Sequence, residues 1–177
     1  GADGVTHQGV FDVGFLSQVP GMTVLAPAAF AELRHFLRHA VYQVQGPVAL
    51  RYPRGGEGAY KADAGLAPAI LRRGRDLTIV CYGTAVNEAL GAAALLEKQG
   101  ITANVLKLGQ ICPLQIEEIL PAIDETGRVL VYEQCAGPGC VGERLLAALE
   151  ERDFLLRGAK LWNLGGGLLP HGDTEAL

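Results

Sequence analysis

Reactive side chains gather in the first nine residues of the sequence, which read GADGVTHQG. Asp3, Thr6 and His7 place a carboxylate, a hydroxyl and an imidazole in a stretch that has neither helical nor strand periodicity. Glycines keep such a segment open, and loops on a rigid scaffold often carry catalytic or binding groups. The same residue types also form ordinary Asx and hydroxyl turns, so this loop alone leaves a purely structural interpretation open.

A second polar segment, residues 51–55 (RYPRG), directly follows the apolar run Val48–Leu50. Arg54 stands between a proline and a glycine, which places it on a turn and not inside a strand. Arg51 follows the apolar run directly and could instead be structural, pairing with a neighbouring carboxylate. Arg54 is therefore the better candidate for contact with a ligand.

Residues 3–12 (DGVTHQGVFD) and 51–55 (RYPRG) together resemble the 1-deoxy-D-xylulose-5-phosphate synthase family, thiamine-diphosphate enzymes of the transketolase group. Residues 19–27 (VPGMTVLAP) resemble the family's segment at the same offset, so the similarity is collinear. It continues more weakly to residues 163–165 (NLG) and 169–172 (LPHG). Transketolase and the β subunits of 2-oxoacid dehydrogenases share this fold but not the RYPRG segment.

The resemblance implies a transferase that condenses pyruvate with glyceraldehyde 3-phosphate, with loss of CO₂, for isoprenoid, thiamine and pyridoxal biosynthesis. Its cofactors in the intact enzyme would be thiamine diphosphate and Mg²⁺, with the protein supplying orientation and charge. By the resemblance, His7 would hydrogen-bond the pyruvate-derived adduct and move protons, for which an imidazole pKa of about 6.5 is suited. Asp3 would order the substrate or the ring nearby. Arg54 would grip the sugar phosphate with its planar guanidinium.

Two features of this family do not occur in the sequence: the Gly-Asp-Gly and Asn motif that binds the metal, and the glutamate that activates the aminopyrimidine ring. We therefore expect the chain to be the C-terminal portion of a longer enzyme. Alone, it should bind neither cofactor and should be inactive. An alternative function is non-catalytic, a transketolase C-terminal-type module that mediates dimer or subunit contacts.

Composition indicates a soluble, cytoplasmic protein. The 177 residues are 49% hydrophobic, but no apolar run approaches the roughly 18 residues that span a membrane. A net charge of −4 argues against a broad nucleic-acid interface, which requires a basic surface. The four cysteines form no Cys-x-x-Cys pair and are expected to be reduced and mostly buried: Cys81, Cys112, Cys135 and Cys140.

Hydrophobic periodicity predicts a strand over residues 23–26, a helix over 30–44 and a strand over 48–52. One face of this helix is apolar, as expected of a face that meets a core: Phe30, Leu33, Leu37, Ala40, Val41 and Val44. Polar residues turn away from that face: Glu32, Arg34, His35, Arg38 and His39. The two histidines have a spacing that could bind a metal, but without a third ligand they are better interpreted as surface residues.

Residues 55–76 contain several glycines and a proline and show no apolar period, which is typical of a linker. The end of this segment, residues 69–72, could form a short strand. Beyond it, apolar strands alternate with helices. Strands are predicted at 77–82, 103–108, 129–132 and 160–164. Helices are predicted at 85–98, 116–124 and 142–151, the first capped by Thr84 and ended by Gly100. Continuously apolar strands are typical of a sheet covered on both faces, so we predict a three-layer α/β domain with a mainly parallel sheet.

The predicted organisation is α/β throughout and has three parts. Residues 1–60 would be the C-terminal part of an incomplete transketolase-like pyrimidine-binding domain, 61–76 a linker, and 77–177 a transketolase C-terminal domain. The first part has too few strands to close a sheet. We expect it to expose strand edges and apolar surface, and the protein therefore to be a homo-oligomer.

Two further features have open interpretations. Residues 137–142 (GPGCVG) open a helix and could bind phosphate at its N-terminus, although a plain tight turn fits better because no phosphate-binding fingerprint is present. Glu133 ends an apolar strand and could be either a carboxylate at a domain interface or an exposed strand-end charge.

Overall fold

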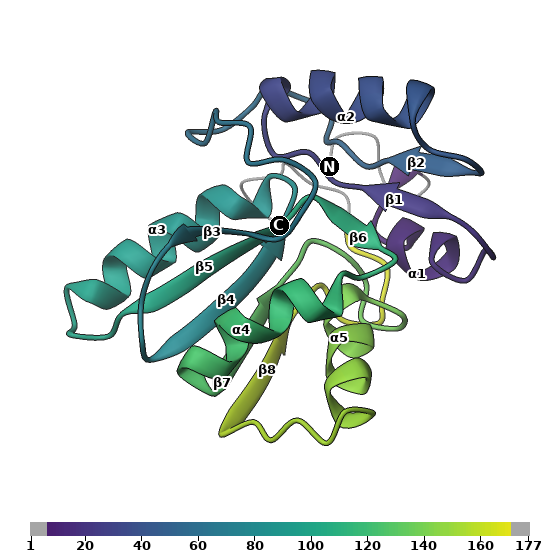
Figure 1. Cartoon of the computed structure of the whole chain (residues 1–177). Coiled ribbons are helices and arrows are strands. Elements are labelled where there is room, and N and C mark those ends of the chain that lie inside the picture. The colour runs from purple at the N-terminus through teal and green to yellow at the C-terminus, as the bar shows by residue number, and fades with distance from the viewer. Residues whose placement is uncertain (1–6, 171–177) are drawn as a thin grey trace.

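Apolar strands build the larger of two sheets in the computed structural model, which describes residues 7–170 (Figure 1). Its strands, in the order β3-β5-β4-β7-β8, are β3 (Ala69–Arg72), β5 (Ala103–Leu108), β4 (Leu77–Tyr82), β7 (Arg128–Tyr132) and β8 (Gly158–Trp162). β4 pairs in parallel with β5 and β7, and β7 with β8, whereas β3 is antiparallel to β5. The predicted, mainly parallel sheet is confirmed.

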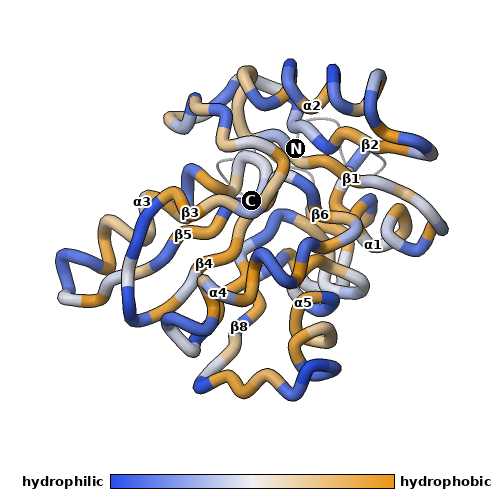
Figure 2. The backbone as a smooth tube through the Cα atoms, in the orientation of Figure 1, coloured by the Kyte–Doolittle hydropathy of each residue, from blue (hydrophilic) through white to orange (hydrophobic). Residues whose placement is uncertain are grey.

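Helices cover both faces of this sheet, as the crossovers between parallel strands require. α3 (Ala85–Glu97) packs on one face, against Ile79 of β4, whose central residues are orange in Figure 2. α4 (Ile116–Thr126) and α5 (Val141–Glu150) contribute to the apolar core on the other face. The three-layer arrangement is therefore confirmed. No helix within residues 7–170 has the length and apolar character needed to cross a membrane.

A smaller sheet has the order β2-β1-β6 and draws on both halves of the chain. β1 (Thr23–Leu25) is parallel to β2 (Val48–Leu50) and antiparallel to β6 (Gln110–Cys112). β6 follows β5 in the sequence, so a later segment completes the N-terminal sheet. Sequence periodicity did not predict β6, because three residues are too few to show an alternation.

α2 (Phe30–Tyr42) lies where predicted, but three of the six residues of its predicted apolar face, Phe30, Leu37 and Val41, are exposed, so that prediction is partly wrong. Leu37 and Val41 are 54% and 64% exposed, whereas Glu32 and Phe36 are fully buried. The helix packs on the smaller sheet through Phe36 and Ala40, and the same face carries the buried Glu32. A buried cation on β5 makes this possible.

The remaining differences from the predicted elements are local. α1 (Asp12–Leu16) was not predicted, and β8 begins and ends two residues earlier than expected, because its pairing with β7 stops at Trp162. Thr84 occupies the N-cap position of α3, but its side chain makes no capping hydrogen bond and lies 3.4 Å from Gln134 Oε1 instead. Gly100 follows the end of α3 with φ of +79°, as expected of a helix terminator.

Candidate functional site

The segment that carries His7 lies against the loops that follow β7 and β8. The Gln8 side chain exchanges two hydrogen bonds with the Leu169 backbone: Nε2 donates to the carbonyl at 2.8 Å, and the amide donates to Oε1 at 3.2 Å. Ala136 N donates to Val10 O at 2.7 Å. His7 itself is exposed, and the residues that follow it are held by these hydrogen bonds to Leu169 and Ala136.

Arg51 joins three segments of the chain. Its Nε donates to Asp12 Oδ1 at 3.1 Å, and its Nη2 donates to Gln134 O at 2.7 Å and to Gly9 O at 3.3 Å. The guanidinium also lies 5.8 Å from the centre of the Tyr82 ring. Burial lowers the pKa of Arg51, but the charge of Asp12, the interaction with Tyr82 and the hydrogen bond to Asp12 together outweigh it, so the pKa is raised. The ion pair that the sequence left open for Arg51 is thus present.

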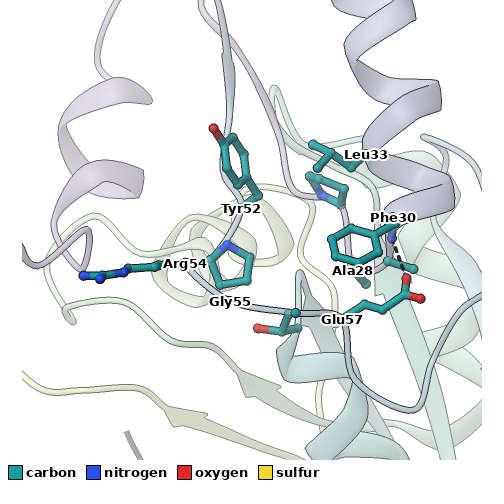
Figure 3. A pocket seen from close by; sticks show the side chains of 12 residues that line it. Ala28, Phe30, Leu33, Tyr52, Arg54, Gly55 and Glu57 are labelled. Atoms are coloured by element: carbon teal, nitrogen blue, oxygen red, sulfur yellow. Dashed lines mark hydrogen bonds between the residues drawn. The ribbon is translucent and has the colours of Figure 1, made fainter. Parts of the chain in front are cut away.

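Arg54 lies in an irregular, exposed loop beside a hollow of about 280 Å³ (Figure 3). The hollow is mainly apolar and lies between this loop and the start of α2, where Phe30 and Leu33 line it together with Tyr52. In Figure 3 the Arg54 side chain extends away from Phe30 and Leu33. The predicted phosphate-binding residue therefore sits on a turn, as expected, while Asp3 lies outside the described residues.

Glu133 is a buried carboxylate, only 1% exposed, so the strand-end surface interpretation is wrong. It accepts hydrogen bonds from Tyr82 Oη at 2.8 Å, Val141 N at 3.0 Å, Gly142 N at 2.9 Å and Cys135 Sγ at 3.2 Å. Burial, followed by the charge of Glu133, raises the pKa of Tyr82 well above its ordinary value, so its hydroxyl remains a donor. Because the first amides of α5 donate to Glu133, the tight-turn interpretation of GPGCVG is favoured over phosphate binding.

A buried ion pair joins α2 to β5. Glu32 Oε1 lies 2.7 Å from Lys107 Nζ, and both side chains are 0% exposed. Glu32 also accepts from Ala28 N at 2.8 Å, Tyr60 Oη at 3.0 Å and Ala64 N at 3.1 Å. Burial lowers the pKa of Lys107, opposed by Glu32. The signal in the sequence was a lysine within an apolar strand, a position that is rarely buried without a partner.

The two histidines of α2 contact separate partners. His35 Nδ1 lies 2.9 Å from Asp63 Oδ2, and His39 Nδ1 lies 3.0 Å from Gln43 Oε1. Within residues 7–170 there is no group of three His, Cys, Asp or Glu side chains that could hold a metal ion. All four cysteines are free and buried, as predicted. The described residues thus offer an exposed imidazole and an exposed guanidinium, which suit proton transfer and anion binding.

Comparison with known proteins matches the chain to two families. Residues 68–177 match the transketolase C-terminal domain, and residues 1–56 match the transketolase pyrimidine binding domain. The 1-deoxy-D-xylulose-5-phosphate synthases of Rippkaea orientalis, Gloeobacter violaceus and Magnetococcus marinus are 40%, 42% and 40% identical over 88%, 84% and 100% of this chain. The matched parts are 26%, 24% and 29% of those proteins, so the chain spans about a quarter of their length. The resemblance seen in the sequence is confirmed.

A solved structure supports the same fold. A chain described as split gene transketolase, inactive beta4 tetramer, superimposes with a TM-score of 0.81 and is 26% identical. The match covers 98% of this chain and 57% of the other. Both sheets, and not only the larger one, therefore follow a transketolase-like arrangement.

Proposed function

We propose that this chain, which belongs to the transketolase C-terminal domain family, is part of a 1-deoxy-D-xylulose-5-phosphate synthase. The intact enzyme condenses pyruvate with glyceraldehyde 3-phosphate and releases CO₂, giving 1-deoxyxylulose 5-phosphate for isoprenoid, thiamine and pyridoxal biosynthesis. It acts in the cytoplasm. The identity of about 40% to synthases that contain this whole region supports the assignment.

One observation carries the assignment of the site. Arg51 belongs to the RYPRG segment and donates to Gly9 O and Asp12 Oδ1, which belong to the segment of His7. Two motifs that are distant in the sequence are therefore neighbours in space. In our proposal, His7 hydrogen-bonds the pyruvate-derived part of the substrate and moves a proton, and Asp3 orders the substrate beside it. Arg54 binds the phosphate of the aldehyde.

Substitutions in the intact enzyme separate these roles. Arg54→Ala should raise the KM for glyceraldehyde 3-phosphate by about one to two decades, because a charge-assisted hydrogen bond contributes roughly 1.5–3 kcal/mol. His7→Ala should chiefly lower kcat, because it removes a proton-transfer group. Steady-state kinetics with each substrate varied in turn measures both effects. An Arg54→Ala enzyme with the wild-type KM for the aldehyde would refute the phosphate assignment.

Thiamine diphosphate supplies the electron sink of this chemistry when it is bound. The described residues provide no three-ligand set for the accompanying Mg²⁺. We assign the metal and the diphosphate to parts of the intact enzyme other than residues 7–170. The isolated chain should then show neither tight thiamine diphosphate binding by calorimetry nor product formation. Robust synthesis of deoxyxylulose phosphate by the 177 residues alone would overturn this part of the proposal.

We also propose that the division into residues 1–60, 61–76 and 77–177 reflects two domains and a linker. The family matches to residues 1–56 and 68–177 support it. The domains are not independent in structure, because β6 of the second completes the sheet of the first.

A second candidate function is self-association without chemistry. It is favoured by the solved relative, which is described as an inactive beta4 tetramer of a split gene transketolase. The exposed apolar residues of α2 supply surface for such contacts. We propose that the intact enzyme is a dimer and that the isolated chain self-associates. A monodisperse monomer in light scattering at high concentration would contradict the second statement.

A further inference from the structure

Glu57 attaches the loop that carries Arg54 to the start of α2 (Figure 3). Its Oε2 accepts a hydrogen bond from Phe30 N at 2.7 Å, and its Oε1 accepts from Lys61 Nζ at 2.9 Å. Phe30 is the first residue of α2, and Ala29 at the N-cap makes no side-chain capping bond. Glu57 thus supplies, from outside the helix, an acceptor for one of the first amides of α2, which have no partner within the helix.

The charge of Glu57 suits this position. The hydrogen bond from the Phe30 amide, followed by that from Lys61, lowers the pKa of Glu57, so the carboxylate is ionised at neutral pH. A negative charge at the first turn also interacts favourably with the helix dipole. The contact therefore holds the two walls of the hollow, the loop and the start of α2, against each other.

Arg51 anchors the other end of the same loop. It is bound to Asp12 on α1 and to the carbonyl of Gln134 after β7, and its side chain is 19% exposed. The two anchors therefore attach residues 51–57 to three different parts of the fold: α1, α2 and the loop after β7.

Between the anchors, the backbone has little regular structure. Residues 51–57 contain no helix or strand, and Gly55 has φ of +128°, a conformation that essentially only glycine adopts. Gly56 follows it and adds further freedom. A loop of this kind takes its position from the contacts at its ends.

We propose that Arg51 and Glu57 are positioning residues that hold Arg54 at the substrate phosphate. The inference deepens the proposed function and rests on it, because it takes phosphate binding by Arg54 as given. Glu57 lies outside the RYPRG segment and is not itself expected to contact the substrate. Its contribution passes through the loop, so its removal should weaken phosphate binding without removing the binding residue.

Trypsin measures the anchoring directly, because Arg54–Gly55 is a cleavable bond inside the loop. In the 177-residue chain, Glu57→Ala should speed cleavage there about three- to tenfold relative to cleavage after Lys98, an exposed residue at the end of α3. Glu57→Gln keeps an oxygen acceptor for the Phe30 amide and should restore most of the resistance.

Two further variants test the other anchor and the specificity of the effect. Asp12→Ala removes the ion pair of Arg51 without changing any tryptic site, and it should also raise the cleavage ratio. Glu117→Gln removes an exposed ion pair with Arg152, neither of which lines the hollow or adjoins Lys98, and should leave the ratio unchanged. Wild-type ratios in both Glu57→Ala and Asp12→Ala would overturn the anchoring.

Kinetics of the intact enzyme test the link to Arg54. Glu57→Ala should raise the KM for glyceraldehyde 3-phosphate about threefold or more and leave the KM for pyruvate near wild type. Added to Arg54→Ala, it should cause no further rise, because the residue being positioned is gone. If Arg54→Ala has no effect on this KM, the proposed function fails, whatever the trypsin result. If Arg54→Ala raises the KM and Glu57→Ala does not, the positioning role alone is wrong.

Discussion

The two sheets of this protein differ in whether their strands and covering helices come from one continuous stretch of the chain. In the larger sheet, β4 and β5 are almost entirely buried, and helices from the same stretch of chain cover both faces. The smaller sheet has three-residue strands, and one of them, β6, comes from beyond β5. Its helix, α2, turns Leu37 and Val41 outward and Glu32 inward.

This difference explains why hydrophobic patterns predicted one region well and misled in the other. Periodicity predicts which face of an element is apolar, and the apolar face is buried only if something covers it. In the larger sheet the covering helices are neighbours in the sequence. In α2, Leu37 and Val41 of the predicted apolar face are exposed, and a salt bridge allows the face with Glu32 and Phe36 to pack inward.

The largest expected effect comes from breaking the ion pair between the two regions. Lys107→Met should lower the free energy of unfolding by about 3–5 kcal/mol, because it leaves Glu32 charged and buried without its cation. Chemical denaturation of the isolated chain measures this loss.

The double variant Glu32→Gln with Lys107→Met is the matched control. It removes both charges and keeps one acceptor oxygen, for the Tyr60 hydroxyl and the Ala64 amide, whereas the Ala28 amide loses its acceptor. It should therefore recover part of the loss. If the single and double variants were equally unstable, electrostatic pairing would not be what holds α2 in its orientation.

Two adjacent residues of α2 test which face is buried. Phe36→Ala should cost about 3 kcal/mol, because its fully buried ring packs with Leu25 and Ala40. Leu37→Ala should change stability by no more than about 0.5 kcal/mol, because that side chain is 54% exposed. Urea denaturation of the two variants gives the comparison directly. A larger cost for Leu37→Ala would restore the predicted apolar face as the packed one.

The exposed apolar residues of α2 are candidates for a contact between two copies of the chain. Leu37→Glu should leave the melting temperature near wild type but reduce oligomer formation in light scattering, if the outer face of α2 forms contacts between chains. Gln99→Glu, at an exposed position just after α3, is a control for the effect of one added negative charge. Unchanged association in Leu37→Glu would remove α2 from the proposed interface.

The sequence predicted β4, β5 and β7 closely because each is a mainly apolar strand of five or six residues bounded by turn residues. β6 and α1 were too short for periodicity to reveal. At the candidate site, the resemblance proposes His7 and Arg54, and the residue types left a structural or a binding role open for Arg51. No local pattern could pair Glu32 with Lys107, because burial of a charge depends on a partner that only the fold brings near.

A smaller effect is expected within the larger sheet. Glu133→Gln should destabilise the chain by about 1–3 kcal/mol, because one carboxylate oxygen becomes an NH₂ donor that faces donors. Tyr82→Phe removes one of those donors and should cost about 1 kcal/mol. Denaturation midpoints of the two variants rank them. A smaller cost for Glu133→Gln than for Tyr82→Phe would mean that the amides of α5 do not depend on this carboxylate.

The smallest effect tests an exposed contact between the residues that directly precede β4 and β5. Asp76 Oδ2 accepts from Thr102 N at 2.6 Å and from Thr102 Oγ1 at 2.8 Å. The backbone bond, followed by the hydroxyl bond, lowers the pKa of Asp76 below 3.8. A carboxyl group whose pKa is lower in the folded than in the unfolded state stabilises the fold at pH values above its unfolded pKa. This contribution is lost as the pH falls through the folded pKa. Asp76→Asn should therefore be less stable than wild type at neutral pH, and the difference should shrink as the pH falls below about 3.8. Urea midpoints across that pH range measure the difference. Thr102→Val keeps only the backbone donor, and its stability should lie between those of wild type and Asp76→Asn. A difference that stayed constant with pH would show that the contact does not stabilise the ionised form of Asp76.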